Sequence, residues 1–179
     1  VIHPDHAERF AALDLASPRL LPPVLGNTSR QGSVRSGLEA LAPHAPDLVL
    51  IQDAARPLVD DDVISGVIAA LGEAALPVIP VTDTIKRSHD GKTAAGTEDR
   101  SKLYAAQTPQ GFAFSAILDA HRRAAAEPTD FTDDAAIAEW AGIVVTLTKG
   151  SPRNLKLTHS DDFERAERLL GGKPMETRT

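Results

Sequence analysis

A chain of 179 residues is long enough for one domain with a full core, and 42% hydrophobic and 25% charged residues are typical of a globular protein rather than a disordered or fibrous one. The net charge of −6 and the aromatic content of 4% argue against a nucleic-acid partner, which needs a basic face and aromatic side chains for base stacking. The sequence has no cysteine, which fits a cytoplasmic protein, and no apolar run near the roughly eighteen residues of a membrane span.

The first predicted elements alternate between helices and extended segments. Helical spacing extends over residues 5–15, with Asp5 as the expected N-cap, and again over residues 33–42. The stretch between them is extended at residues 19–26 and then has the composition of a turn. The apolar run at residues 47–54 is typical of a strand that is covered on both faces in a parallel sheet.

The second half of the chain continues this alternation. The remaining predicted elements are strands at residues 76–87 and 143–150 and helices at residues 60–74, 132–142 and 161–172. The helix at 60–74 has acidic residues in its first turn, where the helix dipole favours them. For the last helix we expect Ser160 as N-cap and Gly171 as C-cap. The alternation predicts an α/β domain with a mostly parallel sheet flanked by helices.

Ligands in such sheets bind beyond the carboxyl ends of the strands, so the residues that follow each apolar run form the candidate site. These segments are residues 26–33, 53–56, 83–87 and 149–156. The first, GNTSRQGS, combines small residues, hydroxyls and Arg30, and it leads into a helix whose free N–H groups could receive an anion or the polar edge of a nucleotide. An ordinary capped loop has the same composition.

The segment DAARP brings a carboxylate and a guanidinium to the end of a predicted buried strand. Asp53 could accept hydroxyl groups or bind a cation, and Ala54 and Ala55 would let another molecule approach the backbone closely. The alternative interpretation is a structural salt bridge between Asp53 and Arg56, because paired charges at strand ends need not be catalytic.

Basic residues gather around two further segments. A polar excursion at residues 88–96 has basic neighbours that would suit an arm reaching over an anionic substrate, although a solvated hairpin is the alternative. Those neighbours are Lys86, Arg87, Arg100 and Lys102. Lys149, Arg153 and Lys156 follow the last predicted strand and indicate a phosphate pocket in a chain that is acidic as a whole. For Lys149 and Arg153, simple solvent exposure is the alternative explanation.

Five stretches in register resemble one family. DAARP, PVTDTIKR, DRSKLYAAQTPQGF, TDDAAIAE and GSPRNLKLT occur in the order and spacing of the 2-C-methyl-D-erythritol 4-phosphate cytidylyltransferases of non-mevalonate isoprenoid biosynthesis, over about residues 1–172. The resemblance implies a Rossmann-like nucleotidyltransferase fold with a protruding β-arm. It also implies cytidylyl transfer from CTP to methylerythritol phosphate, with Mg²⁺ bound mainly by the CTP phosphates. In such a transfer the protein positions two anions and stabilises charge.

The resemblance also assigns roles to individual residues. Arg100 and Lys156 match the pair that orients the attacking phosphate, and they are the expected catalytic residues. The residues expected to bind the nucleotide are Gly26, Asn27, Thr28, Ser33 and Asp53, the last of these being also a candidate metal ligand. The residues expected to bind the acceptor are Arg56, Thr84, Thr108 and Thr132. The family usually has an acidic residue where Thr28 stands.

A homodimer is expected, because in the family the arm, residues 84–100 here, reaches across to the partner's acceptor site. Two alternatives to this function remain open. A ribitol-5-phosphate cytidylyltransferase would use the same sheet with different acceptor contacts, and a non-catalytic nucleotide-binding module would lack the family's chemistry altogether.

Both ends of the chain depart from the family's pattern. The family begins with a strand and a glycine-rich loop whose arginine and lysine stabilise the transition state, and neither is in this sequence. We therefore expect that residues precede Val1 and that residues 1–179 alone would be nearly inactive, by analogy with the loss of an arginine finger. Residues 173–179 are expected to be a linker or tail after the 1–172 domain. Such a linker could lead to a fused cyclodiphosphate synthase domain.

Overall fold

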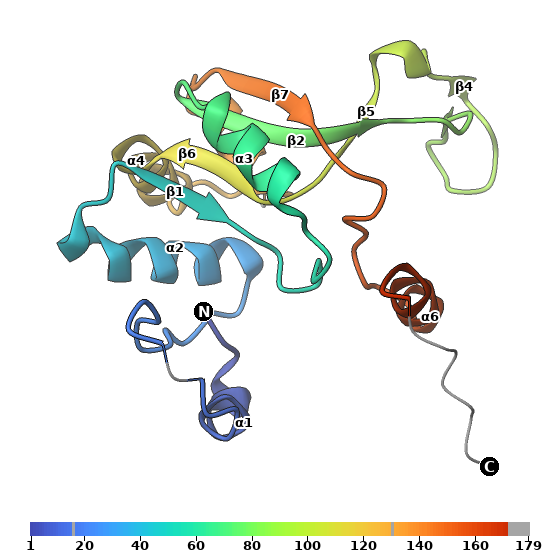
Figure 1. The fold of residues 1–179 in the computed structure, drawn as a ribbon. Helices are drawn as coiled ribbons and strands as arrows, with labels where there is room; N and C mark the ends of the chain where they lie inside the picture. The colour runs from blue at the N-terminus through green and yellow to red at the C-terminus, as the bar shows by residue number, and fades with distance from the viewer. Residues whose placement is uncertain (16, 130, 172–179) are drawn as a thin grey trace. The chain divides into compact units, whose positions relative to one another are not determined.

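The computed structural model describes residues 1–15, 17–129 and 131–171, and it has the α/β fold that the alternation predicted (Figure 1). The α-helices are α1 (Ala7–Ala11), α2 (Arg30–Leu41), α3 (Asp61–Ala69), α4 (Phe114–Ala124), α5 (Asp134–Trp140) and α6 (Ser160–Leu169). Short 3-10 helices are η1 (Pro4–His6), η2 (Ala42–His44) and η3 (Arg100–Lys102). The strands are β1 (Leu48–Ile51), β2 (Ala74–Pro80), β3 (Lys86–Arg87), β4 (Gly96–Thr97), β5 (Tyr104–Ala106), β6 (Gln110–Ala113) and β7 (Val145–Lys149).

The strands form two sheets. The larger has the strand order β1-β6-β2-β5, with β7 also paired to β2. Strand β5 runs antiparallel to β2, and Val78 lies opposite Ala106 in that register. The smaller sheet consists of β3 and β4, which pair antiparallel with Lys86 opposite Thr97.

The chain folds into two compact units, of which the first comprises Val1–Ile51, Gly72–Ala74 and Gly111–Val145. Within it, α4 packs against both α2 and α5. The core of this unit is formed by apolar residues from these helices and from the adjoining strands. Its buried members are Leu38, Ile51, Ala74, Phe112, Phe114, Ile117, Leu118, Ala120, Ala124, Ile137 and Ala138. Large side chains such as Phe112 and Ile117 are almost completely buried. Their burial stabilises the fold most, because the gain grows with the apolar area removed from water.

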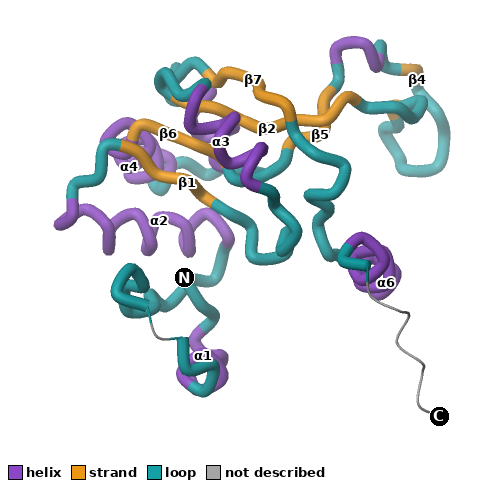
Figure 2. Tube along the Cα trace, in the orientation of Figure 1, coloured by secondary structure: helices purple, strands orange, loops and turns teal. Residues whose placement is uncertain are grey.

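The second unit comprises Gln52–Leu71, Ala75–Gln110 and Thr146–Thr179. In it, Val63 and Val67 are buried on α3, and the Ala75–Val78 part of β2 is buried as a continuous apolar run. Strands β3 and β4 form the base of an exposed hairpin, the predicted arm, which Figures 1 and 2 show as a separate loop of chain beyond β5. The polar excursion predicted at residues 88–96 is therefore the connection of this hairpin, residues 88–95, together with the first residue of β4.

Helix starts follow capping chemistry. The hydroxyl of Ser29 caps α2 by accepting from the Gly32 amide, so the helix begins three residues before the predicted start at residue 33. Two predicted N-caps are wrong. Asp5 lies inside η1, and α6 begins at Ser160 with His159 as its N-cap. The Asp162 carboxylate accepts from the His159 amide at 2.8 Å, which satisfies an N-terminal donor of this helix.

Other element boundaries differ from the predictions. The helix predicted for residues 60–74 ends at Ala69, and Ala74 already belongs to β2, because the apolar run after Gly72 continues as a strand. The strand predicted for residues 76–87 divides at Pro80 into β2 and the arm strand β3. Helix α4 and strands β5 and β6 were not predicted. The tail at residues 173–179 lies outside the described residues.

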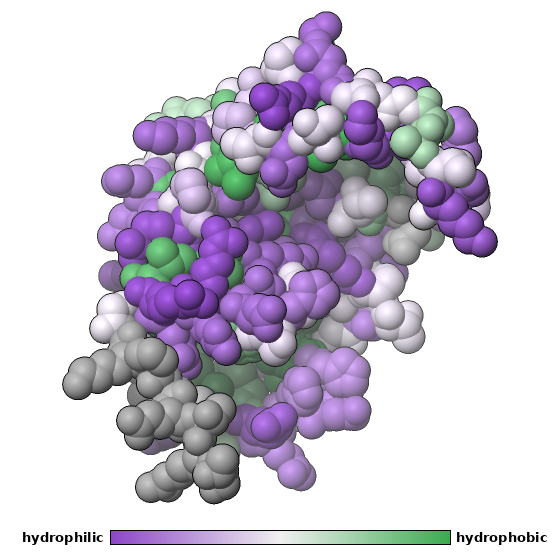
Figure 3. Space-filling view, turned by 90° about the vertical axis from the view of Figure 1, so that its right-hand side faces the viewer, coloured by the Kyte–Doolittle hydropathy of each residue, from purple (hydrophilic) through white to green (hydrophobic). Residues whose placement is uncertain are grey.

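The surface is mainly polar on the face seen in Figure 3, where hydrophobic residues appear in small groups among hydrophilic ones. Such a distribution is ordinary for a globular protein. In the part of the chain that the structure describes, no helix is both long enough and apolar enough to cross a membrane.

Candidate active site

The segment Gly26–Ser33 forms a loop that leads into α2 and is held by its own hydroxyl groups. Ser33 Oγ accepts a hydrogen bond from the Asn27 amide at 2.9 Å and donates one to the Ser29 carbonyl at 2.8 Å. Ser29 Oγ accepts from the Gly32 amide at 3.0 Å. The loop is therefore held together by hydrogen bonds of its own side chains.

Gly26 opens this loop at a position that excludes a side chain. A Cβ atom there would lie 2.9 Å from Ser33 Oγ and 3.4 Å from the Ile2 carbonyl oxygen. The Asn27 side chain accepts from the Thr28 amide at 2.7 Å, and both residues are exposed. The structure thus brings together the predicted nucleotide-binding residues of this segment, and the exposed amide and hydroxyl are the groups available for recognising a base or a ribose.

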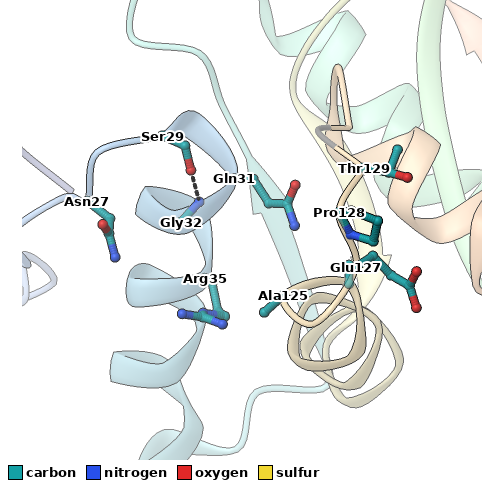
Figure 4. A pocket seen from close by; sticks show the side chains of 10 residues that line it. Asn27, Ser29, Gln31, Gly32, Arg35, Ala125, Glu127, Pro128 and Thr129 are labelled. Atoms are coloured by element: carbon teal, nitrogen blue, oxygen red, sulfur yellow. Dashed lines mark hydrogen bonds between the residues drawn. The ribbon is translucent and has the colours of Figure 1, made fainter.

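An open pocket of about 320 Å³ lies against the same loop, between the first turns of α2 and the segment that follows α4 (Figure 4). Its lining residues are Asn27, Ser29, Gln31, Gly32, Arg35, Ala124, Ala125, Glu127, Pro128 and Thr129. Asn27, a predicted nucleotide-binding residue, belongs to this lining. The amide, guanidinium and carboxylate groups of the lining make it suitable for a small polar molecule.

A second cluster of predicted site residues is built around Asp53, and we call Asp53, Arg56, Thr108 and Lys156 the Asp53 cluster. Lys156 Nζ lies 3.1 Å from Asp53 Oδ2, and the Asp53 backbone amide donates to Thr108 Oγ1 at 3.0 Å. The Asp53 side chain is 17% exposed and that of Lys156 is 48% exposed. The carboxylate is therefore held in place while its ammonium partner reaches solvent.

Arg56, which is largely buried, contacts both Asp53 and the backbone around this cluster. Its Nε lies 4.0 Å from Asp53 Oδ2, Nη1 donates to the Asn154 carbonyl at 2.7 Å, and Nη2 donates to the Ala106 carbonyl at 3.2 Å. Burial lowers the pKa of Arg56 from its ordinary value, and the charge of Asp53 works against that shift. These contacts of Arg56 agree with the structural interpretation of the DAARP segment, and ligand binding by Asp53 stays a prediction.

Two buried amide side chains support the same cluster, and sequence analysis did not select them. Gln107 Nε2 donates to the Ser151 carbonyl at 2.9 Å and its Oε1 accepts from the Ser151 amide at 3.0 Å. Asn154 Nδ2 donates to the Thr108 carbonyl at 2.7 Å. The only available signal was their place inside the stretches AAQTPQ and SPRN, next to Thr108 and close to Lys156.

Two other predicted residues lie on the arm. Thr84 is exposed in the segment between β2 and β3, and Arg100 begins η3. The Arg100 guanidinium donates to the Thr82 carbonyl, which fixes it at the base of the arm. The contacts of Arg100 and Thr84 in the structure are thus with the arm, and their predicted contacts with substrate stay predictions.

Thr132 is exposed and lies two residues before α5, which begins at Asp134 with Asp133 as its N-cap. Asp134 is buried and forms an ion pair with Arg30, whose Nη2 lies 2.8 Å from Asp134 Oδ2. Arg30 was noted in the sequence as part of the nucleotide loop, whereas Asp134 was not selected. Nothing in the spacing of Arg30 and Asp134, 104 positions apart, indicates that they meet.

The residues present fit a magnesium ion that is held mainly by a nucleotide. Within residues 1–15, 17–129 and 131–171, no group of three or more His, Cys, Asp or Glu side chains could hold a metal ion. Asp53 supplies one carboxylate, and Mg²⁺ sites commonly combine one or two carboxylates with substrate phosphates and water. Asp53 is thus a suitable single ligand.

Comparison with known proteins gives a family. Residues 1–172 match the family model described as 2-C-methyl-D-erythritol 4-phosphate cytidylyltransferase. A "Bifunctional enzyme IspD/IspF" from Rhodopseudomonas palustris is 53% identical over 182 residues, which cover 100% of this chain and 46% of that protein. The chain thus spans about half the length of the curated relatives it matches.

Solved structures give the same fold. The 4-diphosphocytidyl-2C-methyl-D-erythritol synthase of Anaerococcus prevotii has a TM-score of 0.86 at 28% identity, covering 96% of this chain and 80% of that one. The 2-C-methyl-D-erythritol 4-phosphate cytidylyltransferase of Thermus thermophilus has a TM-score of 0.73 at 33% identity, covering 86% and 78%. These neighbours confirm the predicted nucleotidyltransferase fold.

Proposed function

Because the chain belongs to the 2-C-methyl-D-erythritol 4-phosphate cytidylyltransferase family of enzymes, we propose that it transfers the cytidylyl group of CTP to 2-C-methyl-D-erythritol 4-phosphate. A phosphate oxygen of the acceptor forms a bond to the α-phosphorus of CTP, and the bond from that phosphorus to the bridging oxygen of the β-phosphate breaks. The products are CDP-methylerythritol and pyrophosphate. The reaction belongs to non-mevalonate isoprenoid biosynthesis.

The observation that carries this proposal is the Asp53 cluster. Thr108 holds the backbone of Asp53, Arg56 lies 4.0 Å from its carboxylate, and the half-exposed ammonium of Lys156 lies 3.1 Å from the same carboxylate. A reaction between two anions needs a cation that can move from its resting partner to a phosphate, and a lysine on a flexible stem supplies it. In the proposed mechanism Lys156 contacts the attacking phosphate and Asp53 binds the sugar hydroxyls.

The remaining predicted residues have complementary roles in the proposal. The exposed Asn27 and Thr28 groups, next to Ser33 at the start of α2, would recognise cytosine and ribose. Arg100 would clamp the acceptor phosphate with its planar guanidinium. Thr84, Thr108, Thr132 and Arg56 would contribute hydroxyl and guanidinium contacts to the acceptor.

Magnesium would be held by the CTP phosphates and by Asp53. When bound, such an ion neutralises charge on the triphosphate and favours departure of pyrophosphate. We further propose a cytoplasmic homodimer whose arms, residues 84–100, reach the partner's acceptor site. A cyclodiphosphate synthase domain in the same protein is proposed from the bifunctional relatives.

The experiment is a measurement of pyrophosphate release by the protein expressed from its complete gene, with CTP and Mg²⁺. Methylerythritol phosphate, ribitol 5-phosphate and buffer are compared as acceptors. Release that depends on methylerythritol phosphate is the expected result. Preference for ribitol 5-phosphate would replace the proposed acceptor, and silence with both acceptors from a folded protein would leave the non-catalytic binding module.

A pair of variants tests whether the Asp53 cluster carries the activity. Asp53→Asn keeps the shape of the side chain and removes its charge, so turnover should fall by at least about tenfold while the protein remains folded. Asp61→Asn is the matched control, because Asp61 is an exposed carboxylate on α3 in the same unit. Equal activity of the two variants would contradict the assigned role of Asp53.

A further inference from the structure

A carboxylate, a guanidinium and an imidazole meet inside the first unit, at a place that the proposed mechanism does not use. Asp134 Oδ2 lies 2.8 Å from Arg30 Nη2, and Asp134 Oδ1 lies 3.2 Å from His121 Nε2. The side chains of Asp134 and His121 are completely buried, whereas that of Arg30 is 37% exposed. We call these three residues the Asp134 cluster.

The Asp134 cluster joins three helices at their ends. Arg30 is the first residue of α2, Asp134 is the first residue of α5, and His121 lies in the last turn of α4. Burial by itself would raise the pKa of Asp134, but contact with His121 and Arg30 outweighs it and lowers that pKa. Asp134 is therefore an anion between two basic groups.

Two predicted substrate-binding segments are continuous with this ion pair. Arg30 belongs to the Gly26–Ser33 loop, one position after the N-cap Ser29. Asp134 stands two residues after the exposed Thr132. Because the ion pair links the start of α2 to the start of α5, a movement of one helix start would also move the other. Both a predicted nucleotide contact and a predicted acceptor contact would then shift.

We propose that Arg30 and Asp134 are positioning residues, whose ion pair keeps the Gly26–Ser33 loop and the Thr132 turn at a fixed separation so that the nucleotide and acceptor contacts form together. This inference rests on the proposed function. Neither residue needs to touch a substrate, because the buried carboxylate acts through the backbone at the start of α5 and the guanidinium through the start of α2.

The energetics of an ion pair with a buried carboxylate favour a positioning role over simple stabilisation. Asp134 is completely buried while Arg30 is 37% exposed, so the pair repays the desolvation of its carboxylate only partly. Apolar side chains of similar size often hold two helices as well or better. What the pair supplies is a short, directional contact at 2.8 Å. In catalysis such precision matters, since a misplacement of about 1 Å can cost roughly a hundredfold in rate.

The chain contains a matched control for this pair. Arg122 on α4 makes a two-pronged contact with Glu39 near the end of α2, with Nε and Nη2 at 2.8 and 2.6 Å from the two carboxylate oxygens. This pair also joins α2 to another helix through an arginine and a carboxylate, but both side chains are about half exposed and belong to neither predicted substrate segment.

The test compares Arg30→Ala, Arg30→Lys and Arg122→Ala in the protein expressed from its complete gene. For Arg30→Ala we expect the KM values for both CTP and the acceptor to rise, with kcat/KM lower by about 10- to 100-fold. Arg30→Lys should recover part of the loss, because it restores the charge without the planar fork. Arg122→Ala should keep wild-type kinetic constants.

Backbone hydrogen exchange provides a readout that does not depend on activity. Arg30→Ala should speed exchange in both the 26–33 and the 131–136 segments, because each helix start loses its restraint, while Arg122→Ala should leave both unchanged. Faster exchange in the 26–33 segment alone would overturn the proposed link to Thr132.

The outcomes separate this inference from the proposed function. An inactive wild-type protein would refute the proposed function, and the Kd for CTP measured by calorimetry would then replace the KM. Unchanged constants in Arg30→Ala would overturn the positioning role even if exchange changed. If Arg30→Ala does not fold, Arg30→Gln and Arg30→Lys, which keep most of the side chain, decide the same question by the same measurements.

Discussion

The Asp53 cluster and the Asp134 cluster use the same chemistry in different surroundings. Each has a carboxylate with an arginine and a second basic residue near it. In the Asp53 cluster the second base is Lys156, which is 48% exposed. In the Asp134 cluster it is His121, which has no exposed surface at all.

This difference in exposure separates two uses of an ion pair. An ammonium at the surface can exchange its carboxylate for a substrate phosphate at little cost, because water screens both states. A buried carboxylate cannot lose its partner without a large desolvation penalty. The first arrangement suits binding and catalysis, and the second suits a fixed distance between structural elements.

The largest expected effect concerns the buried carboxylate. Asp134→Ala leaves His121 and Arg30 without their anion, so we expect the free energy of unfolding to fall by about 3–5 kcal/mol. Urea denaturation measures this change. Asp119→Ala is the control, because Asp119 on α4 pairs with Arg123 at 3.6 Å with both side chains more than half exposed. If Asp134→Ala lowers the free energy of unfolding no more than Asp119→Ala does, the contrast between the two clusters is wrong.

The next effect concerns the exposed ammonium and should appear in activity alone. Lys156→Ala should lower kcat/KM by about 10²- to 10³-fold, comparable to the loss of one donor that stabilises transition-state charge. The unfolding midpoint should hardly change, because Lys156 is half exposed. Arg168→Ala serves as control, because Arg168 is an exposed cation on α6 that pairs with Glu164 and belongs to no predicted substrate segment. A strong loss of stability in Lys156→Ala would mean that this cluster, too, is structural.

A smaller effect tests how closely the support of the Asp53 cluster is packed. A Cβ atom at Gly150 would lie 2.5 Å from Gln107 Oε1 and 2.9 Å from the Val78 carbonyl oxygen. Gly150→Ala should therefore destabilise the protein by about 1–3 kcal/mol. Gly66→Ala in α3 meets nothing within 4 Å and should stabilise it by about 0.5–1 kcal/mol. Calorimetric melting of both variants checks the sign, and stabilisation by Gly150→Ala would contradict the packing described.

The smallest expected effect is a change in the free energy of unfolding that appears only at acidic pH. The pKa of Asp134 is lowered on folding, because its contacts with His121 and Arg30 outweigh burial. Its contribution to stability is therefore complete above the ordinary carboxyl pKa of about 3.9 and is lost as the pH falls from there through the folded value. The difference in unfolding free energy between the wild type and Asp134→Asn should shrink over that interval. A difference that stays constant with pH would contradict this assignment.

The sequence indicated three residues of the Asp53 cluster because their place along the chain follows from the geometry of α/β sheets. Residues that follow strands collect at one edge of an α/β sheet, and Asp53, Arg56 and Lys156 were selected from such positions. The fold class followed from the alternation of elements for the same reason. The individual roles of these residues are carried by the family resemblance and await the experiments above.

Other features were missed for identifiable reasons. Helix α4 has buried residues with helical spacing, at Phe114, Ile117, Leu118, His121 and Ala124. That signal was present in the sequence and was not used. The N-caps Asp5 and Ser160 were wrong because aspartate and serine stand inside a turn as readily as at its start, and backbone conformation decides which.

By itself the sequence determined the α/β class and the strand ends that form the candidate site, because these depend on the periodicity of residues along the chain. The family followed from the resemblance of five stretches that occur in the family's order and spacing. The tertiary structure alone decided that Arg30 pairs with Asp134, that Asn154 bonds Thr108 and that Gln107 bonds Ser151. Such pairings join residues far apart in the chain, and their strength depends on burial and on distances of about 3 Å, which no linear pattern records.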